Sequence, residues 1–325
     1  MILYVVFFSI AAGLGYPALN RYDPRVVPGL SDVQSYGAMV ARTPAPGPDH
    51  MKFRVLIPSM ARPLYRLAKG HVGSWDPVMF GLVAVDALFE AATALLIVLL
   101  GTRTLGGYPV ALIGAVLYLV NFAVPNMRLA GLVDAGEGFF LLAVYWCLSE
   151  FEFWPLPFIA ILGSLTKETF VPFSIVFMAA WCAVMRKKVP RSATAWIVFS
   201  WVTSFAAIGI LHYAVNGRFE NPVIFAETLR GNANYLAHFA SSLWDRNLLY
   251  VFVWLLPLGI PRLKRFPKSW LIAAGATCVV VFVLDGYYGG APGTVGRALF
   301  SIAGPLLALS AAEFLAGFRA AGPAC

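Results

Sequence analysis

Charged residues are scarce in this chain: they make up 12% of its 325 residues, against roughly 25% in an ordinary soluble domain. Hydrophobic residues account for 60% of the chain, and the mean hydropathy is +0.76. This composition excludes a large soluble core. The longest apolar runs, such as residues 78–100 and 270–284, are continuous. They predict an all-α, polytopic transmembrane bundle, because a membrane barrel would show alternating segments of about ten residues.

Cysteine is also rare and unclustered. Four cysteines occur, and none forms a Cys-x-x-Cys pair or a Cys/His cluster, so neither a disulfide framework nor a zinc site is predicted. The net charge of +8 fits a membrane protein with basic cytoplasmic loops, and no nucleic-acid partner is expected. The start of the chain lacks a basic n-region and a clear cleavage site, which favours a retained first helix.

The apolar segments predict a single integral membrane domain, residues 1–325, built from about ten helices. Residues 20–75 are expected to form a long first extracytoplasmic loop with interfacial helices, and residues 216–247 a second long extracytoplasmic loop. The run 155–165 is too short to cross a bilayer upright, so a broken segment is expected there. Helices are expected near residues 2–18, 77–100, 108–124, 155–165, 170–185, 193–215, 248–260, 270–284 and 298–318, with a further one ending at residue 150.

The first polar stretch contains an amphipathic pattern at residues 52–69. Arg62, Arg66 and Lys69 fall on one helical face beside apolar positions. An interfacial helix is predicted, with these cations reaching toward lipid headgroups. The two prolines of this segment predict helix starts or breaks.

Basic residues are densest in two short loops, residues 186–191 and 262–268. The positive-inside rule gives most weight to short loops, so these loops and both chain termini are expected in the cytoplasm. The opposite side, which carries Asp32, is then expected to face outward.

Asp32 is a candidate catalytic residue, because a carboxylate near the membrane face can remove a proton from an attacking hydroxyl. The local sequence is equally consistent with a helix N-cap at Ser31 or Asp32.

Three cations, Arg54, Lys167 and Arg297, lie where apolar segments meet the same interface. Fixed Arg and Lys side chains stabilise the negative charge that develops on a leaving phosphate. The alternative is that these side chains only reach the lipid headgroups from helix ends.

Two pairs of carboxylates are spaced by a helical turn. Asp134 and Glu137 could bind sugar hydroxyls, hold a divalent ion such as Mg or Mn, pair with Arg128, or favour a helix N-terminus. Asp86 and Glu90 lie inside a long apolar helix, where a carboxylate needs a cavity or a partner. A proton-coupled transporter would use such a pair, and Asp86 is the nearer of the two to the outer side.

An acidic residue, Asp32, lies in the first expected outer loop and is followed by Tyr36. Further short segments follow in order: Lys52–Pro58, Asn126–Arg128, Gly131–Asp134, Leu165–Thr169 and Gly296–Phe300 with Pro305. The most specific of these motifs is Thr166-Lys167-Glu168-Thr169. Taken together, these segments resemble the GT-C superfamily of membrane glycosyltransferases.

The resemblance implies transfer of a sugar from a polyprenyl-phosphate donor to a glycan, lipid or protein acceptor on the outer side of the membrane. Asp32 is then the expected general base, and Arg54, Lys167 and Arg297 hold the donor phosphate. No cofactor is expected, apart from the divalent ion considered above. The residues expected to contact substrate are Tyr36, Asp86, Asp134, Glu137 and Glu168.

The implied location is a bacterial cytoplasmic membrane, with the site facing outward, membrane lipids as partners and a cell-envelope glycan as product. The alternative is a non-enzymatic lipid-linked-sugar transporter or a membrane assembly scaffold. Asp86 and Glu90 favour the transporter, but matched inverted repeats are not found in the sequence.

Overall fold

The computed structural model describes residues 1–21, 31–44, 49–217, 235–288 and 294–320, and these residues are helical or in short connections, without a strand. This confirms the all-α prediction. The α-helices are α1 (Ile2–Arg21), α2 (Ser31–Ala41), α3 (Leu56–Ala68), α4 (Pro77–Leu105), α5 (Tyr108–Leu119), α6 (Asp134–Glu150), α7 (Leu156–Thr166), α8 (Phe170–Met185), α9 (Arg191–Asn216), α10 (Tyr235–Leu243), α11 (Arg246–Phe252), α12 (Leu255–Gly259), α13 (Lys268–Tyr288) and α14 (Thr294–Ala320). Shorter turns are η1 (Asp49–Phe53), the π-helical η2 (Val124–Arg128) and η5 (Ile260–Arg265).

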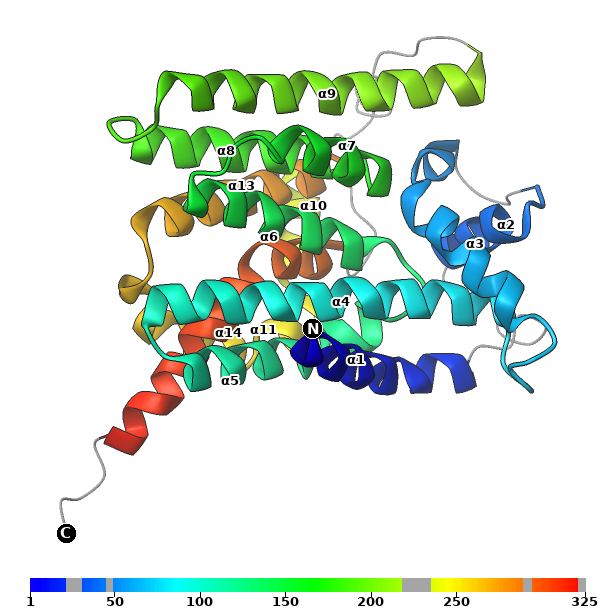
Figure 1. The fold of residues 1–325 in the computed structure, drawn as a ribbon, viewed down its shortest axis with the longest axis horizontal. Helices are drawn as coiled ribbons and strands as arrows, with labels where there is room; N and C mark the ends of the chain where they lie inside the picture. The colour runs from blue at the N-terminus through cyan, green and yellow to red at the C-terminus, as the bar shows by residue number, and fades with distance from the viewer. Residues whose placement is uncertain (22–30, 45–48, 218–234, 289–293, 321–325) are drawn as a thin grey trace.

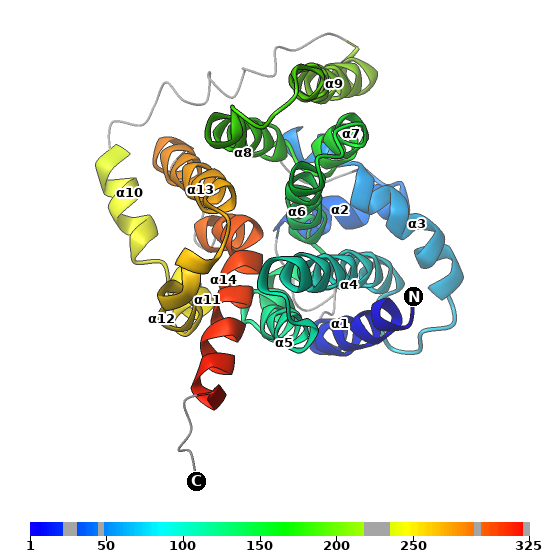
Figure 2. The same cartoon turned by 60° about the vertical axis from the view of Figure 1, so that its left-hand side comes forward.

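Helices α4, α8 and α9 run roughly along the long axis of the molecule, and α2 and α3 lie beside the end at which α4 begins (Figure 1). Seen closer to end-on, α6 occupies the middle of the bundle, among α4, α7, α8 and α14 (Figure 2). Thirteen of the 17 residues of α6 are buried. The acidic first turn of α6 is therefore held in place from several sides.

Helix α4 has well-defined ends. Asp76 precedes Pro77, and its side chain accepts a hydrogen bond from the backbone N of Met79 at 2.7 Å. This is the N-cap arrangement that satisfies an otherwise unpaired donor, and Pro suits the first helical position. The helix stops where Gly106 takes a left-handed conformation, with φ of 71°. The helix predicted near residues 77–100 thus continues to Leu105.

Five helices of the described residues are long and apolar enough to cross a membrane, and the bent pair Ala237–Leu243 and Arg246–Arg265 brings the number to six if it is one span. Three further apolar helices, α5, α7 and α8, are shorter than a span. The prediction of two separate helices around residues 155–185 is confirmed, with a break at Lys167–Thr169. Several long apolar helices support a membrane-embedded protein.

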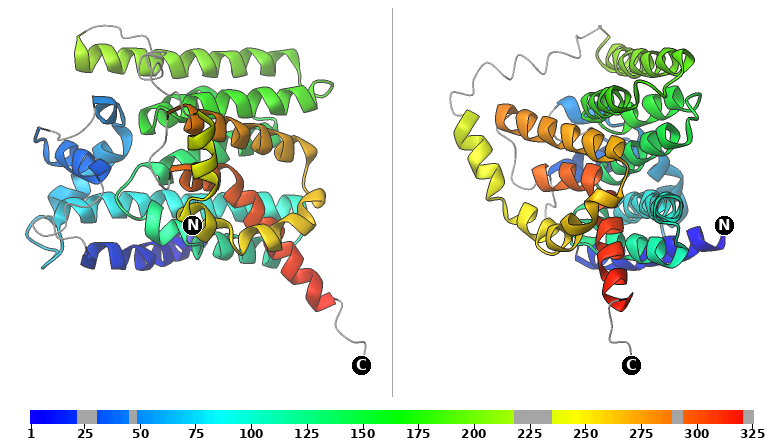
Figure 3. Two further views of the ribbon diagram at one scale, coloured as in Figure 1. Left: turned by 180° about the vertical axis from the view of Figure 1, so that it is seen from behind. Right: turned by 90° about the vertical axis from the view of Figure 1, so that its left-hand side faces the viewer.

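Helix α9 lies along one edge of the bundle in both views of Figure 3. It packs mainly against α7, and large apolar side chains on its other faces are exposed, such as Phe199, Val202, Phe205 and Ile210. Such a surface suits contact with lipid tails rather than water.

The first long polar stretch contains helices, as predicted, and the second contains a helix that was not predicted. In residues 20–75 the chain forms α2, η1 and α3, and α3 continues through Pro63. The prediction of a break at Pro63 is wrong, whereas the predicted helix start at Pro58 is confirmed, since this proline lies in the first turn of α3. In residues 216–247, Tyr235–Leu243 forms α10, and residues 218–234 lie outside the described part of the chain.

Candidate functional site

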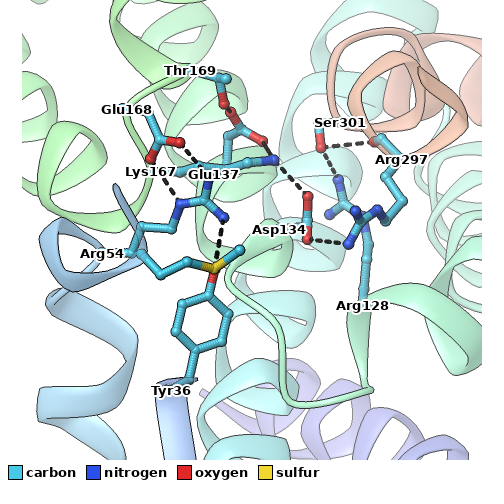
Figure 4. Close-up of polar contacts among 11 residues, drawn as sticks. Tyr36, Arg54, Arg128, Asp134, Glu137, Lys167, Glu168, Thr169, Arg297 and Ser301 are labelled. Atoms are coloured by element: carbon cyan, nitrogen blue, oxygen red, sulfur yellow. Dashed lines mark hydrogen bonds and ion pairs between the residues drawn. The ribbon is translucent and has the colours of Figure 1, made fainter. Parts of the chain in front are cut away.

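Eight polar residues from distant segments meet at the end of the bundle where α4 and α6 begin (Figure 4). We call them the polar network. They come from α2, the residue after η1, the first turn of α6, the α7–α8 break and the first turn of α14. The members are Tyr36, Arg54, Asp134, Glu137, Lys167, Glu168, Thr169 and Arg297.

Arg54 and Glu168 form the first half of the polar network. Arg54 Nε donates to Glu168 Oε2 at 2.8 Å, and Arg54 Nη2 donates to Glu168 Oε1. This is a two-pronged contact, the geometry that makes Arg–carboxylate pairs strong. Arg54 Nη1 also donates to the Tyr36 hydroxyl at 2.7 Å. All three side chains are largely buried, so the α7–α8 break is fixed against the first polar stretch.

Lys167 organises the second half. Its Nζ donates to Asp134 Oδ1 at 2.8 Å and to Glu137 Oε2 at 3.1 Å. The other oxygen of Glu137 accepts a hydrogen bond from the Thr169 hydroxyl. Lys167 has extended backbone at the end of α7, which directs its side chain away from the helix and toward the start of α6. The break therefore positions the lysine between two carboxylates.

Arg297 joins the network from α14. Its Nη1 donates to Asp134 Oδ2 at 3.3 Å, so Asp134 is shared between Arg297 and Lys167. The side chain of Arg297 is 18% exposed, compared with 13% for Lys167 and 9% for Arg54. Arg297 is thus the most accessible of the three cations and the one held by the longest contact.

Electrostatic effects favour the charged forms of the groups in the α7–α8 break. Burial alone would raise the pKa of Glu168, but the adjacent Arg54 charge and its hydrogen bonds outweigh burial and lower this pKa to about 2. Burial would lower the pKa of Lys167, but Asp134 and Glu137 raise it above its ordinary value. Burial raises the pKa of Tyr36 to about 12, although Arg54 opposes this effect. At neutral pH Glu168 and Lys167 are therefore fixed charges, and Tyr36, which contacts Arg54, is a neutral phenol.

Asp32 lies in the first turn of α2, four residues before Tyr36 and on the same helical face. It is half-buried. Its negative charge contributes to raising the pKa of Tyr36, after the larger effect of burial. The candidate base is therefore within electrostatic range of the network. Its position in the first turn is also consistent with the capping interpretation.

Asp86 and Glu90 lie outside the polar network, fully buried in α4. Asp86 Oδ2 accepts a hydrogen bond from the backbone N of Gly131 at 3.1 Å. Glu90 Oε1 pairs with Arg128 Nη1 at 2.9 Å. The expectation that Arg128 pairs with Asp134 or Glu137 is thus replaced by pairing with Glu90, a contact that burial makes necessary for both charges.

Arg128 is the centre of a second group, which we call the buried cluster: Glu90, Tyr118, Arg128 and Ser301. Arg128 Nη1 donates to the Tyr118 hydroxyl at 2.8 Å, and Nη2 donates to Ser301 Oγ at 2.6 Å. Ser301 Oγ in turn donates to the backbone O of Arg297 at 3.1 Å. The buried cluster therefore supports the turn of α14 that carries Arg297.

Two glycines of α6 make room for these contacts. A Cβ at Gly138 would lie 2.4 Å from Arg128 Nη2, and one at Gly136 would lie 2.9 Å from Thr166 Cγ2. Both distances are too short for a real side chain. The group that approaches Gly138 is the guanidinium of Arg128, and the group that approaches Gly136 is the side chain of Thr166 on α7.

Sequence reasoning missed the roles of Thr169, Tyr118 and Ser301. Thr169 belongs to the most specific motif, but its hydroxyl had no assigned partner. A buried carboxylate such as Glu90 requires a cation, and that requirement could have directed attention to Arg128. Nothing in the sequence pointed to Tyr118 or Ser301.

The polar network contains three cations and three carboxylates, so its formal charges balance. A phosphate can bind at this site only if one of the cations releases its carboxylate partner and contacts the phosphate instead. Among the described residues no group of three His, Cys, Asp or Glu side chains is placed to hold a metal ion.

Comparison of the chain with protein-family models, curated proteins and solved structures finds no match.

Proposed function

We propose that the chain is a membrane glycosyltransferase that moves a sugar from a polyprenyl-phosphate donor to an acceptor hydroxyl. The supporting observation is the convergence of Arg54, Lys167 and Arg297, from three distant segments, at the end of the bundle that also carries Asp32. Lipid headgroup contacts alone would not require three cations to be largely buried and held in place by carboxylates.

The donor phosphate is bound by exchange of partners at Arg297. This side chain has the largest exposed fraction of the three cations, and its contact with Asp134 is 3.3 Å long. When Arg297 turns to a phosphate oxygen, Asp134 keeps its shorter contact with Lys167. Arg54 and Lys167 then contribute mainly through their fixed positive charge, which acts strongly because the site is partly shielded from water.

Asp32 is the general base in this proposal. It accepts the proton of the acceptor hydroxyl while the acceptor oxygen forms a bond to the anomeric carbon of the sugar. The bond from that carbon to the phosphate oxygen breaks, and polyprenyl phosphate leaves with the electron pair. The configuration at the anomeric carbon is inverted. Tyr36, Asp134, Glu137 and Glu168 border the sugar or its phosphate, and Asp86 lies deeper.

In the membrane, the polar network faces outward from a bacterial cytoplasmic membrane, and the basic loops at residues 186–191 and 262–268 face the cytoplasm. The five or six long spans and the three shorter apolar helices together give eight or nine segments within the bilayer. The first polar stretch, with α2 and α3, rests at the outer interface. A glycan, lipid or protein supplies the acceptor hydroxyl from the outer side.

The direct test is a transfer assay with the purified protein in lipid vesicles. Radiolabelled polyprenyl-phosphate glucose, mannose and arabinose are supplied as donors, with a membrane extract as acceptor, and release of polyprenyl phosphate is followed. Asp32→Asn is expected to lower the rate by about 10²- to 10⁴-fold, the usual contribution of a general base.

Asp76→Asn is a matched control. It makes the same chemical change near the same end of the bundle, and Asn retains the helix-capping function of Asp76. Equal losses in the two variants, or full activity of Asp32→Asn, would exclude Asp32 as the base.

The second candidate is a transporter of lipid-linked sugars. It is favoured by Asp86 Oδ1 and Glu90 Oε2, buried oxygens that have no hydrogen-bond partner among the described residues. If Asp86→Asn stops movement of the lipid-linked sugar across vesicle membranes while no donor is ever cleaved, the transporter replaces the enzyme.

A further inference from the structure

A polar hollow lies at the opposite end of α4 from the polar network. Its volume is about 400 Å³, within the range of small-molecule pockets. It is lined by the end of α4, the end of α6 and the connection into α13, namely by Leu100, Arg103, Thr104, Tyr145, Ser149, Arg265, Phe266 and Pro267. Two arginines and three hydroxyl groups therefore surround one space.

The lining carries positive charge and no carboxylate. Arg103 Nη1 pairs with Glu150, and Arg265 Nη1 pairs with Glu313 at 2.8 Å, but neither glutamate is part of the lining. Each arginine is held through one nitrogen, and about half of each side chain is exposed, 54% and 56%. The remaining N–H groups are available to an anion, and an arginine fork matches phosphate oxygens.

Part of the lining is buried and held in place by aromatic packing. Leu100, Tyr145 and Phe266 are buried. The ring of Tyr145 stacks on Trp270 with centroids 4.2 Å apart, and Phe266 packs edge-on against the same indole. A ligand that combines a phosphate with an apolar part fits this combination better than a fully hydrated ion.

The position of the hollow along the bundle indicates the source of such a ligand. α4 has 29 residues and is about 43 Å long at the usual rise per residue, close to the thickness of a bilayer with its headgroups. Arg103 and Thr104 lie in its last turn, and Arg265 lies three residues before the start of α13, another candidate span. With α4 crossing the bilayer along its length, the hollow lies at the level of the headgroups.

We propose that this hollow binds the phosphate headgroup of an anionic phospholipid, with Arg103 and Arg265 as the phosphate ligands. The hydroxyls of Thr104 and Ser149 border the headgroup, and the acyl chains leave along the outside of the bundle. The site is separate from the proposed donor site, which lies at the other end of α4. The proposal of a lipid site does not depend on whether the chain is an enzyme.

Native mass spectrometry of the full-length protein, released from detergent with added phosphatidylglycerol or phosphatidylcholine, tests the proposal. Retention of phosphatidylglycerol in preference to phosphatidylcholine is expected. The double variant Arg103→Gln/Arg265→Gln should weaken phosphatidylglycerol binding by about tenfold or more, because each arginine contributes a charge-assisted contact.

The double variant Lys187→Gln/Lys188→Gln is the matched control, since it removes the same charge from a basic loop outside the hollow. It should bind like the parent protein. Ser149→Phe is a second test that keeps both arginines but fills the space, and it should also lose the lipid. Detergent melting curves show whether each variant is folded.

Three results would overturn the proposal. The first is equal loss of lipid in the lysine and arginine double variants, which indicates only a diffuse charge effect. The second is unchanged binding in Ser149→Phe. The third is displacement of the lipid by soluble glycerol phosphate or inorganic phosphate at similar concentration, which would assign the hollow to a soluble anion.

Discussion

Replacement of Glu168 by Gln tests whether the polar network holds the α7–α8 break in place. In the folded protein Glu168 receives two hydrogen bonds from Arg54, and the two side chains are only 11% and 9% exposed. Glutamine keeps the shape and one acceptor oxygen but removes the charge. Arg54 is then left buried with the Tyr36 hydroxyl as its best remaining partner.

The size of the effect follows from the pKa of Glu168, which falls from 4.5 to about 2 in the folded protein. That shift corresponds to about 3 kcal/mol of stabilisation at neutral pH. The value agrees with the roughly 3–5 kcal/mol lost when one partner of a buried ion pair is removed. Because this pKa is lowered on folding, the stabilisation is complete above pH 4.5 and disappears as the pH falls toward 2.

The assay is unfolding in detergent with increasing dodecyl sulfate, followed by circular dichroism at several pH values. The free energy of unfolding of the parent protein should exceed that of Glu168→Gln by about 3 kcal/mol at neutral pH. This difference should become smaller below pH 4.5. Glu313→Gln is the control, because its partner Arg265 is 56% exposed and such pairs contribute about 1 kcal/mol at most. Equal effects of the two substitutions, or a difference that does not change with pH, would refute the reasoning.

Three further predictions concern the neighbouring contacts. Arg297→Gln should lower transfer about 100-fold or more. It should lower the free energy of unfolding by only about 1–2 kcal/mol, because Asp134 keeps its shorter bond to Lys167; the transfer assay and a melting curve together check this, and a loss of folding would contradict it. Gly138→Ala should lower the free energy of unfolding by about 3 kcal/mol, because the added methyl group displaces Arg128 from its carboxylate partner. Gly275→Ala is the control, since its added methyl group meets nothing within 4 Å. It should be neutral or slightly stabilising in the same dodecyl sulfate titration. Tyr36→Phe removes the hydroxyl that accepts a bond from its arginine partner and should cost about 2 kcal/mol in that titration; an unchanged midpoint would show that water replaces the hydroxyl.

The fold was predictable where the signal is local in sequence. Hydropathy alone located the long spans, and the short apolar runs on either side of Lys167 predicted a break that the structure contains. The ends of elements were less predictable. Pro63 continues α3 instead of ending it, and α4 extends past Gly101, because packing and capping at Gly106 outweigh the local preference.

The candidate site was predictable as a set of residues but not as a set of contacts. The sequence pointed to Arg54, Lys167 and Arg297 as cations near one interface. Their pairing depends on which helices lie side by side, which no local pattern encodes. The same holds for Arg128: it precedes Asp134 by six residues, yet its partner is Glu90 on α4.

The charge balance of the polar network has a consequence for the proposed reaction. A polyprenyl-phosphate sugar is a phosphodiester with one negative charge, and the released monoester carries between one and two, since its second pKa is near 6. A fixed excess of positive charge would bind both tightly and hinder release of the product. A neutral network with one loosely held cation avoids this difficulty. Arg297 can contact the phosphate as its negative charge increases. Asp134 then keeps its shorter bond to Lys167, so the movement of Arg297 leaves no carboxylate without a cation.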